Sequence, residues 1–179
     1  MARLLLCVMF VLLCRPAIAL VDDIAVAAAS DLQFAIKELI VEYEKQTGHH
    51  VKLSLGSSGN FYAQLQQGAP FDLYFSADIG YPKKLEEAGL TVPGSLYRYA
   101  VGRVVLWAPK QSPVEVSKGL TVLRDAAVRK IAIANPKHAP YGRAAVAAME
   151  QSQVYEEVTD RLVLGEHISQ AAQFIESGA

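Results

Sequence analysis

The sequence predicts an α/β protein of two lobes, each built on a mainly parallel β-sheet flanked by helices. Apolar strand-like segments alternate with helical segments over residues 23–90, an order typical of parallel sheets. A long extended run over residues 95–110, broken by Gly102, interrupts this alternation and indicates a crossover. We therefore expect lobe 1 over residues 20–100, followed by the crossover and a partial lobe 2 over residues 101–179.

The N-terminus has the pattern of an export signal. A basic start precedes the uncharged apolar run Leu4–Leu13, and Ala17–Ala19 has the small-x-small pattern of a signal peptidase site. This run is too short to cross a bilayer, which takes about 20 residues. We therefore predict a signal peptide at residues 1–19 and an exported protein. A lipid anchor at Cys14 is the weaker alternative, because Leu13 before it is bulkier than a lipoprotein signal normally tolerates.

Composition narrows the possible partners. Both cysteines, Cys7 and Cys14, lie in the predicted leader, so the rest of the chain offers neither a disulfide nor a thiolate. Removing the leader residues Arg3 and Arg15 from the 17 lysines and arginines leaves 15 bases against 18 acidic residues. A mildly acidic surface without basic runs argues against nucleic acid as a partner.

The first strand and helix of lobe 1 follow from local patterns. A buried strand is expected over residues 23–30, because small and apolar residues fill it. A helix is expected over residues 31–48, with Ser30 and Gln33 as a capping box at its start and Gly48 at its end. The apolar face of this helix is predicted from residues at helical spacing, namely Leu32, Ala35, Ile36, Leu39, Ile40 and Tyr43.

Two further strand–helix pairs complete this lobe. The strands are expected over residues 50–55 and 70–77, and the helices over residues 61–68 and 80–90. The small-residue turn Gly56–Asn60 joins the first strand of these pairs to its helix.

Lobe 2 is expected to hold fewer elements. Residues 129–151 predict a strand, a loop with Pro136 and Pro140, and a helix; residues 160–179 predict a short strand, a turn and an amphipathic helix. Because few strands are then left for lobe 2 and nothing returns to lobe 1, we expect a chain truncated at its C-terminus, with an incomplete second lobe.

The turn Gly56–Asn60 allows several kinds of site. A nucleotide-phosphate loop needs a lysine after its last glycine, but Asn60 and Phe61 stand there, and a dinucleotide fingerprint needs three glycines. A serine-hydrolase elbow would read G-x-S-x-G, and this turn misses that spacing by one residue. The turn therefore fits none of these three motifs.

Enzymatic and metal sites have little support elsewhere. The sequence offers no H-x-x-x-H motif and no acidic cluster at ligand spacing. An exported serine hydrolase using Ser57 or Ser58 is left as an alternative, although no histidine has a compelling acidic partner in the sequence. The candidate bases are His49, His50, His138 and His167.

The repeated arrangement of strand, small-residue turn and helix favours an anion site. Ser30 precedes one helix, Ser57 and Ser58 precede another, and the amides near Tyr141 and Ile168 lie at two more. Helix N-termini direct backbone N–H groups at a ligand and favour negative charge. Ligands of open α/β sheets bind outside the carboxyl ends of strands, where all four turns lie. The pattern predicts neutral donors around an oxyanion, with cavity size setting specificity.

Four motifs carry a resemblance to a known family. They are A-A-A-S at Ala27–Ser30, the Ser57-Ser58 turn, G-A-P-x-D-x-x-x-S-A-D at Gly68–Asp78, and N-P-x-x-A-P-x-G at Asn135–Gly142. Together they resemble the periplasmic molybdate/tungstate-binding proteins of ABC importers, from residue 23 to the last residue. The resemblance implies a type II periplasmic-binding-protein fold, with two α/β lobes and a cleft between them.

The resemblance also implies which residues hold the oxyanion. Ser30 and Ser58 would donate side-chain hydroxyls, and Tyr141 and Ile168 would donate backbone amides. Molybdate would be bound as an oxyanion, with no metal directly coordinated, no cofactor and no catalytic residue. In relatives a further ligand, commonly a tyrosine hydroxyl, lies beyond the point where this chain ends, as do the return crossover and the strands that complete both lobes.

The resemblance implies a periplasmic monomer that captures molybdate or tungstate and delivers it to an ABC transporter permease. Asp72 and Asp78 are interpreted as helix-capping and strand-end acids rather than metal ligands, because carboxylates facing an oxyanion would repel it. A binding protein for sulfate or phosphate is the alternative within the same fold. The serine hydrolase is the alternative from a different class.

Overall fold

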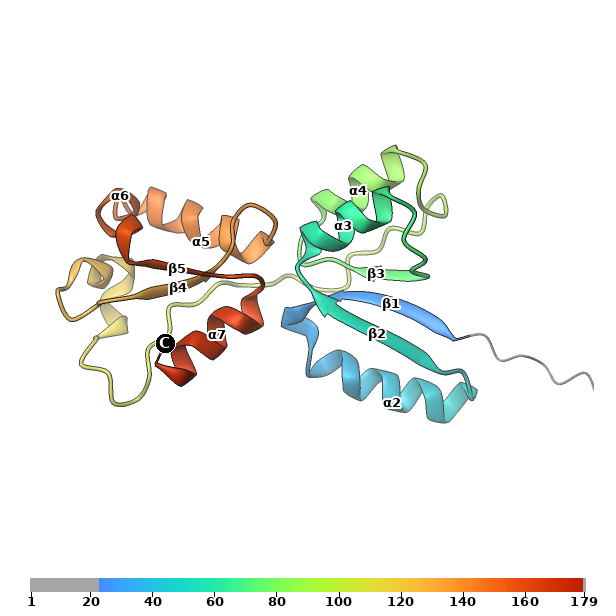
Figure 1. Ribbon diagram of the computed structural model, residues 1–179, viewed down its shortest axis with the longest axis horizontal. Helices are drawn as coiled ribbons and strands as arrows, with labels where there is room; N and C mark the ends of the chain where they lie inside the picture. The colour runs from blue at the N-terminus through green and yellow to red at the C-terminus, as the bar shows by residue number, and fades with distance from the viewer. Residues whose placement is uncertain (1–22, 179) are drawn as a thin grey trace, which may run out of the picture.

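The computed structural model describes residues 23–178 and shows two α/β lobes joined by an extended segment (Figure 1). The predicted fold class, with parallel sheets flanked by helices, is confirmed. The predicted signal peptide at residues 1–19, and Cys14 with it, lies outside the described residues. Within residues 23–178, no helix has the length and apolar content needed to cross a membrane.

Lobe 1 is built on a three-stranded parallel sheet with β1 in its centre, in the order β2-β1-β3. Figure 1 shows α2 on one face of this sheet and α3 and α4 on the other. The strands are β1 (Ile24–Ala29), β2 (Val51–Gly56) and β3 (Leu73–Phe75), and the helices are η1 (Ser30–Leu32), α2 (Ala35–Thr47), α3 (Ser58–Gln66) and α4 (Gly80–Glu87).

Lobe 2 has a parallel pair of strands, β4 and β5, among the described residues. Figure 1 shows α5 and α7 on opposite sides of this pair. The strands are β4 (Ile131–Ala134) and β5 (Leu162–Gly165), and the helices are η2 (Val116–Arg124), α5 (Pro140–Gln151), α6 (Tyr155–Val158), η3 (Thr159–Arg161) and α7 (Ile168–Ser177).

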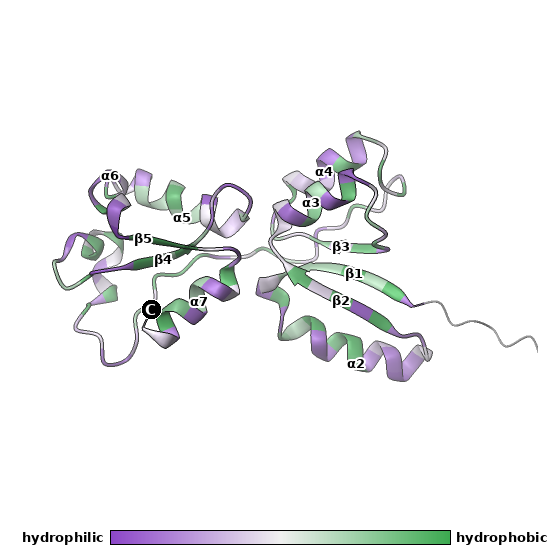
Figure 2. Cartoon of the chain, viewed as in Figure 1, coloured by the Kyte–Doolittle hydropathy of each residue, from purple (hydrophilic) through white to green (hydrophobic). Residues whose placement is uncertain are grey.

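Each lobe has its own apolar core, and the strands supply much of it (Figure 2). In lobe 1, Ala27 and Ala28 of the central strand are fully buried, and Ala28 belongs to one apolar cluster with Ile36 of α2. In lobe 2, Val154 and Val158 are fully buried. Because two helix layers close on β1, small side chains suit that strand, and its end is firmly positioned.

The start of the first helix differs from the prediction. Ser30 does not form a capping box: it opens the 3-10 turn η1, where its backbone oxygen accepts a hydrogen bond from Gln33 N–H, and α2 begins only at Ala35. The predicted apolar face is also too wide, since Leu39 is 68% exposed. Ser30 instead forms hydrogen bonds with Ser169 of lobe 2. The predicted end at Gly48, with φ +72°, is confirmed.

The extended run over residues 95–110 connects the lobes without joining either sheet. Its apolar side chains are largely open to solvent, with Tyr97, Val101 and Val105 each more than three-quarters exposed. Gly102 lies against Tyr141 of lobe 2, because a Cβ built at this glycine would stand 2.7 Å from the tyrosine hydroxyl oxygen. The crossover therefore passes close to the side chain of Tyr141.

Candidate functional site

A small cavity lies between the lobes, where strands of both sheets end. It is narrow: the centre of a water molecule can move within about 10 Å³ of it, which is room for about one water molecule. The four residues predicted to bind an anion all line it: Ser30 and Ser58 from lobe 1, and Tyr141 and Ile168 from lobe 2. Parallel strands direct their carboxyl ends to one edge of each sheet, and both of these edges border the cavity.

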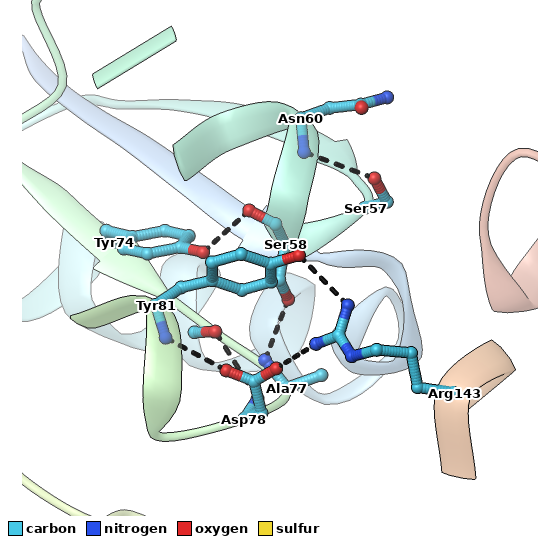
Figure 3. Close-up of polar contacts among 9 residues, drawn as sticks. Ser57, Ser58, Asn60, Tyr74, Ala77, Asp78, Tyr81 and Arg143 are labelled. Carbon is cyan, nitrogen blue, oxygen red and sulfur yellow. Dashed lines mark hydrogen bonds and ion pairs between the residues drawn. The ribbon is translucent and has the colours of Figure 1, made fainter. Parts of the chain in front are cut away.

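Ser58 is placed by the turn between β2 and α3. Its neighbour Ser57 is the N-cap of α3 and accepts a hydrogen bond from Asn60 N–H at 3.4 Å. Ser58 is fully buried, and its Oγ accepts a hydrogen bond from Ala77 N–H at 2.9 Å (Figure 3). Since that bond occupies a lone pair of the oxygen, the hydroxyl hydrogen of Ser58 is available to an acceptor in the cavity.

The carbonyl of Ser58 is held by Tyr74, whose hydroxyl donates to it at 2.7 Å (Figure 3). Burial raises the pKa of Tyr74 well above its ordinary value, so this phenol is a neutral donor at physiological pH. The backbone and the side chain of Ser58 are thus both fixed by neighbours, and the serine is preorganised.

Ser30 follows the buried strand β1 and is 3% exposed. Its backbone oxygen accepts a hydrogen bond from Ser169 Oγ at 2.9 Å, and its own Oγ accepts one from Ser169 N–H at 3.4 Å. Ser169 belongs to the first turn of α7 in lobe 2. Ser30 therefore lines the cavity and also connects the lobes.

Tyr141 and Ile168 offer backbone N–H groups from the first turns of α5 and α7. The first amides of a helix have no partner within it. In the described part of the chain, neither of these two amides donates to a protein acceptor, whereas those of Gly142 and Ser169 do. Two unpaired amides at helix N-termini on one cavity are suited to an anion.

Asp31 is a cavity residue that the sequence prediction missed. It lines the same cavity, and its Oδ2 accepts a hydrogen bond from the Tyr141 hydroxyl at 2.9 Å across the lobes. Burial raises the pKa of the Asp31 carboxyl, and the bond from Tyr141 opposes that rise. The available signal was its position, directly after the predicted ligand Ser30.

Asp72 and Asp78 have the structural roles predicted for them. Asp72 Oδ2 accepts from Ala25 N–H at 2.7 Å at the start of β1. Asp78 Oδ1 accepts from Tyr81 N–H at 3.1 Å in the first turn of α4. Residues 23–178 contain no cluster of three or more His, Cys, Asp or Glu side chains that could hold a metal ion.

Asp78 has a second partner, which comes from lobe 2. Arg143 of α5 donates to Asp78 Oδ2 at 2.5 Å and to the Tyr81 hydroxyl at 2.9 Å (Figure 3). Its guanidinium carbon also lies 5.1 Å from the centre of the Tyr81 ring. Arg143 is thus engaged in bridging the lobes.

The prediction that no histidine has a compelling acidic partner in the sequence needs correction, because two have one in the structure. His50 Nδ1 lies 2.7 Å from Glu44 Oε1, six residues before it in the chain, and His138 is the second. His138 Nδ1 lies 2.8 Å from Ser57 Oγ, and its Nε2 lies 3.4 Å from Glu166 Oε1. The same carboxylate oxygen accepts a shorter hydrogen bond, of 2.7 Å, from Asn60 Nδ2. His138 and Glu166 are in lobe 2 and their partners in lobe 1, so folding brings together residues that no local spacing could reveal.

Comparison with known proteins places the chain in a family. A family model described as bacterial extracellular solute-binding protein matches residues 24–179. The molybdate-binding protein ModA of Azotobacter vinelandii is 43% identical over 156 residues, and that of Rhodobacter capsulatus is 42% identical over 156 residues. Each match covers 87% of this chain and 61% of the relative, so the chain spans about three-fifths of the length of these curated relatives.

A solved structure agrees with this assignment. The periplasmic molybdate-binding protein of Azotobacter vinelandii matches with a TM-score of 0.81 and 38% identity, over 87% of this chain and 67% of that one. The resemblance stated from the four motifs is thereby confirmed at the level of family and fold. The chain belongs to the bacterial extracellular solute-binding proteins, with the two-lobed fold of a periplasmic binding protein.

Proposed function

We propose that this chain forms the oxyanion-binding part of an exported protein that captures molybdate or tungstate and delivers it to an ABC transporter permease. The observation that carries the proposal is the set of neutral donors on one cavity. Two serine hydroxyls, of Ser30 and Ser58, and two unpaired amides, of Tyr141 and Ile168, line it. A tetrahedral oxyanion accepts hydrogen bonds on all sides, so donors from several directions suit it.

Capture would couple ligand binding to the arrangement of the lobes. Ser30 and Ser58 come from lobe 1, and the two amides come from lobe 2. An oxyanion that contacts all four binds the closed arrangement more tightly than an open one and shifts the population toward it. The closed, loaded form would be the state that a permease recognises.

Selection among oxyanions would follow from fixed donors. Ser58 is fully buried and held by Ala77 and Tyr74, so it cannot follow a smaller ligand inward. A smaller tetrahedral anion such as sulfate would leave one or more donors unpaired, and each unmade bond of this kind costs about 1–3 kcal/mol. This reasoning favours molybdate or tungstate over sulfate or phosphate.

The remaining roles follow from capture and delivery. We infer a periplasmic location, export through the signal at residues 1–19, and action as a monomer. No chemical step, cofactor or directly coordinated metal is part of the proposal, since molybdate enters and leaves as the intact oxyanion. Two relatives named molybdate-binding proteins, at 42% and 43% identity, support it.

One observation bears on the hydrolase alternative, namely the row of Ser57, His138 and Glu166. With distances of 2.8 and 3.4 Å between neighbours, the three side chains are arranged in the spatial order of the nucleophile, base and acid of a catalytic triad. However, Ser57 Oγ caps α3, and Glu166 makes its shorter bond to Asn60. We therefore interpret the row as a contact between lobes, and we expect no labelling of Ser57 by a serine-reactive phosphonate.

Titration calorimetry tests the proposed function. The exported chain is titrated with molybdate, tungstate, sulfate and phosphate in separate runs, and then with molybdate in the presence of equal sulfate. We expect heat from molybdate and tungstate and no displacement by sulfate. Displacement of molybdate by sulfate at equal concentration would contradict the selectivity, and silence with all four anions would contradict the function.

A further inference from the structure

We propose that Asp31 sets the charge preference of the cavity, so that an oxyanion dianion binds together with a proton on this carboxylate. The inference rests on the proposed function and adds to it a residue that controls affinity through pH. It assigns to Asp31 a role opposite to that of the four donors, because a carboxylate opposes a bound anion.

Position is the first argument. Asp31 follows Ser30 directly and lines the cavity that Ser58 and Ile168 also line. It also lines an adjoining hollow together with Arg103. An anion that accepts hydrogen bonds from Ser30 would therefore lie close to the Asp31 carboxylate.

The partner of Asp31 is the second argument. The hydroxyl of Tyr141 donates to Asp31 Oδ2 at 2.9 Å. A glycine at position 102 of the crossover makes room for this hydroxyl, since a Cβ there would stand 2.7 Å from its oxygen. Burial, followed by the nearby Asp31 charge, raises the pKa of Tyr141 far above its ordinary value. Tyr141 thus donates one neutral hydrogen bond, which orients the carboxylate and does not cancel its charge.

The other charged groups around Asp31 leave it without a cation partner. Within residues 23–178, no lysine, arginine or histidine nitrogen lies within 4 Å of its carboxylate oxygens. The groups facing this region are Tyr99 and Arg103 of the crossover, Tyr141 of α5 and His167 before α7. Arg143 is already paired with Asp78.

The consequence is a proton-linked affinity. The Asp31 side chain as a whole is exposed, yet partial burial of its carboxyl raises the pKa of that group without a ligand. A dianion beside it would raise that pKa further, because like charges disfavour ionisation. Between the free and the bound pKa of Asp31, binding takes up a proton, and affinity falls by up to about tenfold per pH unit as pH rises. Above the pKa that Asp31 has in the complex, the carboxylate stays ionised, and the anion binds against its negative charge.

Calorimetry of the exported chain with molybdate and tungstate at a series of pH values tests this. Runs in two buffers of different ionisation enthalpy count the protons taken up. We expect the wild type to take up a proton on binding and Asp31→Asn to take up none at this position. If the ligand raises the pKa of Asp31 by roughly one unit, Asp31→Asn should bind about tenfold more tightly than the wild type at pH 8. Asp31→Glu, which keeps the charge, should retain the pH dependence.

A second pair of variants separates Asp31 from its neighbours. Tyr141→Phe keeps the backbone amide of residue 141 but removes the hydroxyl that favours the ionised form of Asp31. The pH range over which affinity falls should therefore move to higher pH in this variant. His167→Gln removes the histidine that lines the same cavity and should keep the proton uptake. Uptake that persists in Asp31→Asn and disappears in His167→Gln would overturn the inference, as would weaker binding by Asp31→Asn at pH 8. Absence of any oxyanion binding by the wild type would instead refute the proposed function.

Discussion

The guanidinium of Arg143 and the carboxylate of Asp78 form an ion pair of 2.5 Å between the two lobes. Arg143 is in the first turns of α5, whereas Asp78 precedes α4. The same arginine donates to the Tyr81 hydroxyl, so one side chain joins lobe 2 to two groups of lobe 1 (Figure 3). The pair therefore belongs to the contact between the lobes rather than to the core of either one.

Replacing this arginine should weaken closure. In Arg143→Met the ion pair and the bond to Tyr81 are lost; because both partners are partly solvated, a loss of about 0.2–1 kcal/mol for the pair is expected. Molybdate affinity should fall by about 1.4- to fivefold, and small-angle X-ray scattering should show a larger radius of gyration without ligand. The matched control is Arg124→Met, because Arg124 pairs with Glu157 inside lobe 2 at 2.9 Å. Equal effects of the two variants would contradict a closing role for Arg143.

The two serine hydroxyls should each contribute to affinity. Ser30→Ala and Ser58→Ala leave one oxygen of the anion without a donor, which costs about 1–3 kcal/mol per site. Calorimetry should show both losses, and thermal unfolding should show a lower stability for Ser58→Ala, because the Ala77 amide also loses its acceptor. The exposed Ser117→Ala is the control and should leave affinity unchanged. Unchanged affinity in both cavity variants would contradict the site.

A methyl group at Gly59 should keep the lobes apart. A Cβ there would stand 2.4 Å from the His138 carbonyl oxygen and 2.6 Å from the Tyr81 hydroxyl oxygen, and the first of these belongs to the backbone of lobe 2. We expect Gly59→Ala to reduce molybdate affinity at least about tenfold while the thermal stability of each lobe is kept. Gly80→Ala is the matched control, since its Cβ would meet Asp78 at an ordinary 3.5 Å. Normal binding by Gly59→Ala would show that the contact with His138 is not needed.

The core of lobe 2 can be probed without touching the cavity. Met149 is 2% exposed and packs in the apolar cluster, so Met149→Ala should lower the free energy of unfolding by about 2–5 kcal/mol. Leu39→Ala, at a position 68% exposed on α2, should change it by less than about 0.5 kcal/mol. Urea denaturation measures both. A large decrease in the free energy of unfolding of Leu39→Ala would support the wide apolar face that the sequence predicted for this helix.

Patterns along the chain predicted the strands that lead to the cavity. The run Ala27–Ser30 and the turn Gly56–Asn60 have local signals, namely small apolar residues and helix-start residues, and both lie at strand ends in the structure. Parallel pairing then requires Ser30 and Ser58 to lie near each other. Strand order therefore groups the two serines of lobe 1, whereas bringing Tyr141 and Ile168 to the same cavity depends on how the lobes meet.

Contacts between the lobes could not be predicted in this way. Asp31 and Tyr141 are 110 residues apart, and Ser57 and His138 are 81 residues apart, so no periodicity relates them. The capping box expected at Ser30 failed for the same reason. Its hydroxyl oxygen has a partner from the other lobe, Ser169, and a local rule that assumes an isolated helix cannot include it.

The hydrogen bonds and ion pairs described between the lobes join serine to serine, serine to histidine, asparagine to glutamate, tyrosine to aspartate, arginine to aspartate, and the Gly59 N–H to the His138 carbonyl. Water can replace each of them at little net free energy, unlike a buried apolar seam. Under the proposed function the protein has to release its oxyanion as well as bind it. A contact between the lobes made of exchangeable hydrogen bonds would open without unfolding either lobe. The polar contact between the lobes would thus make the proposed oxyanion binding reversible.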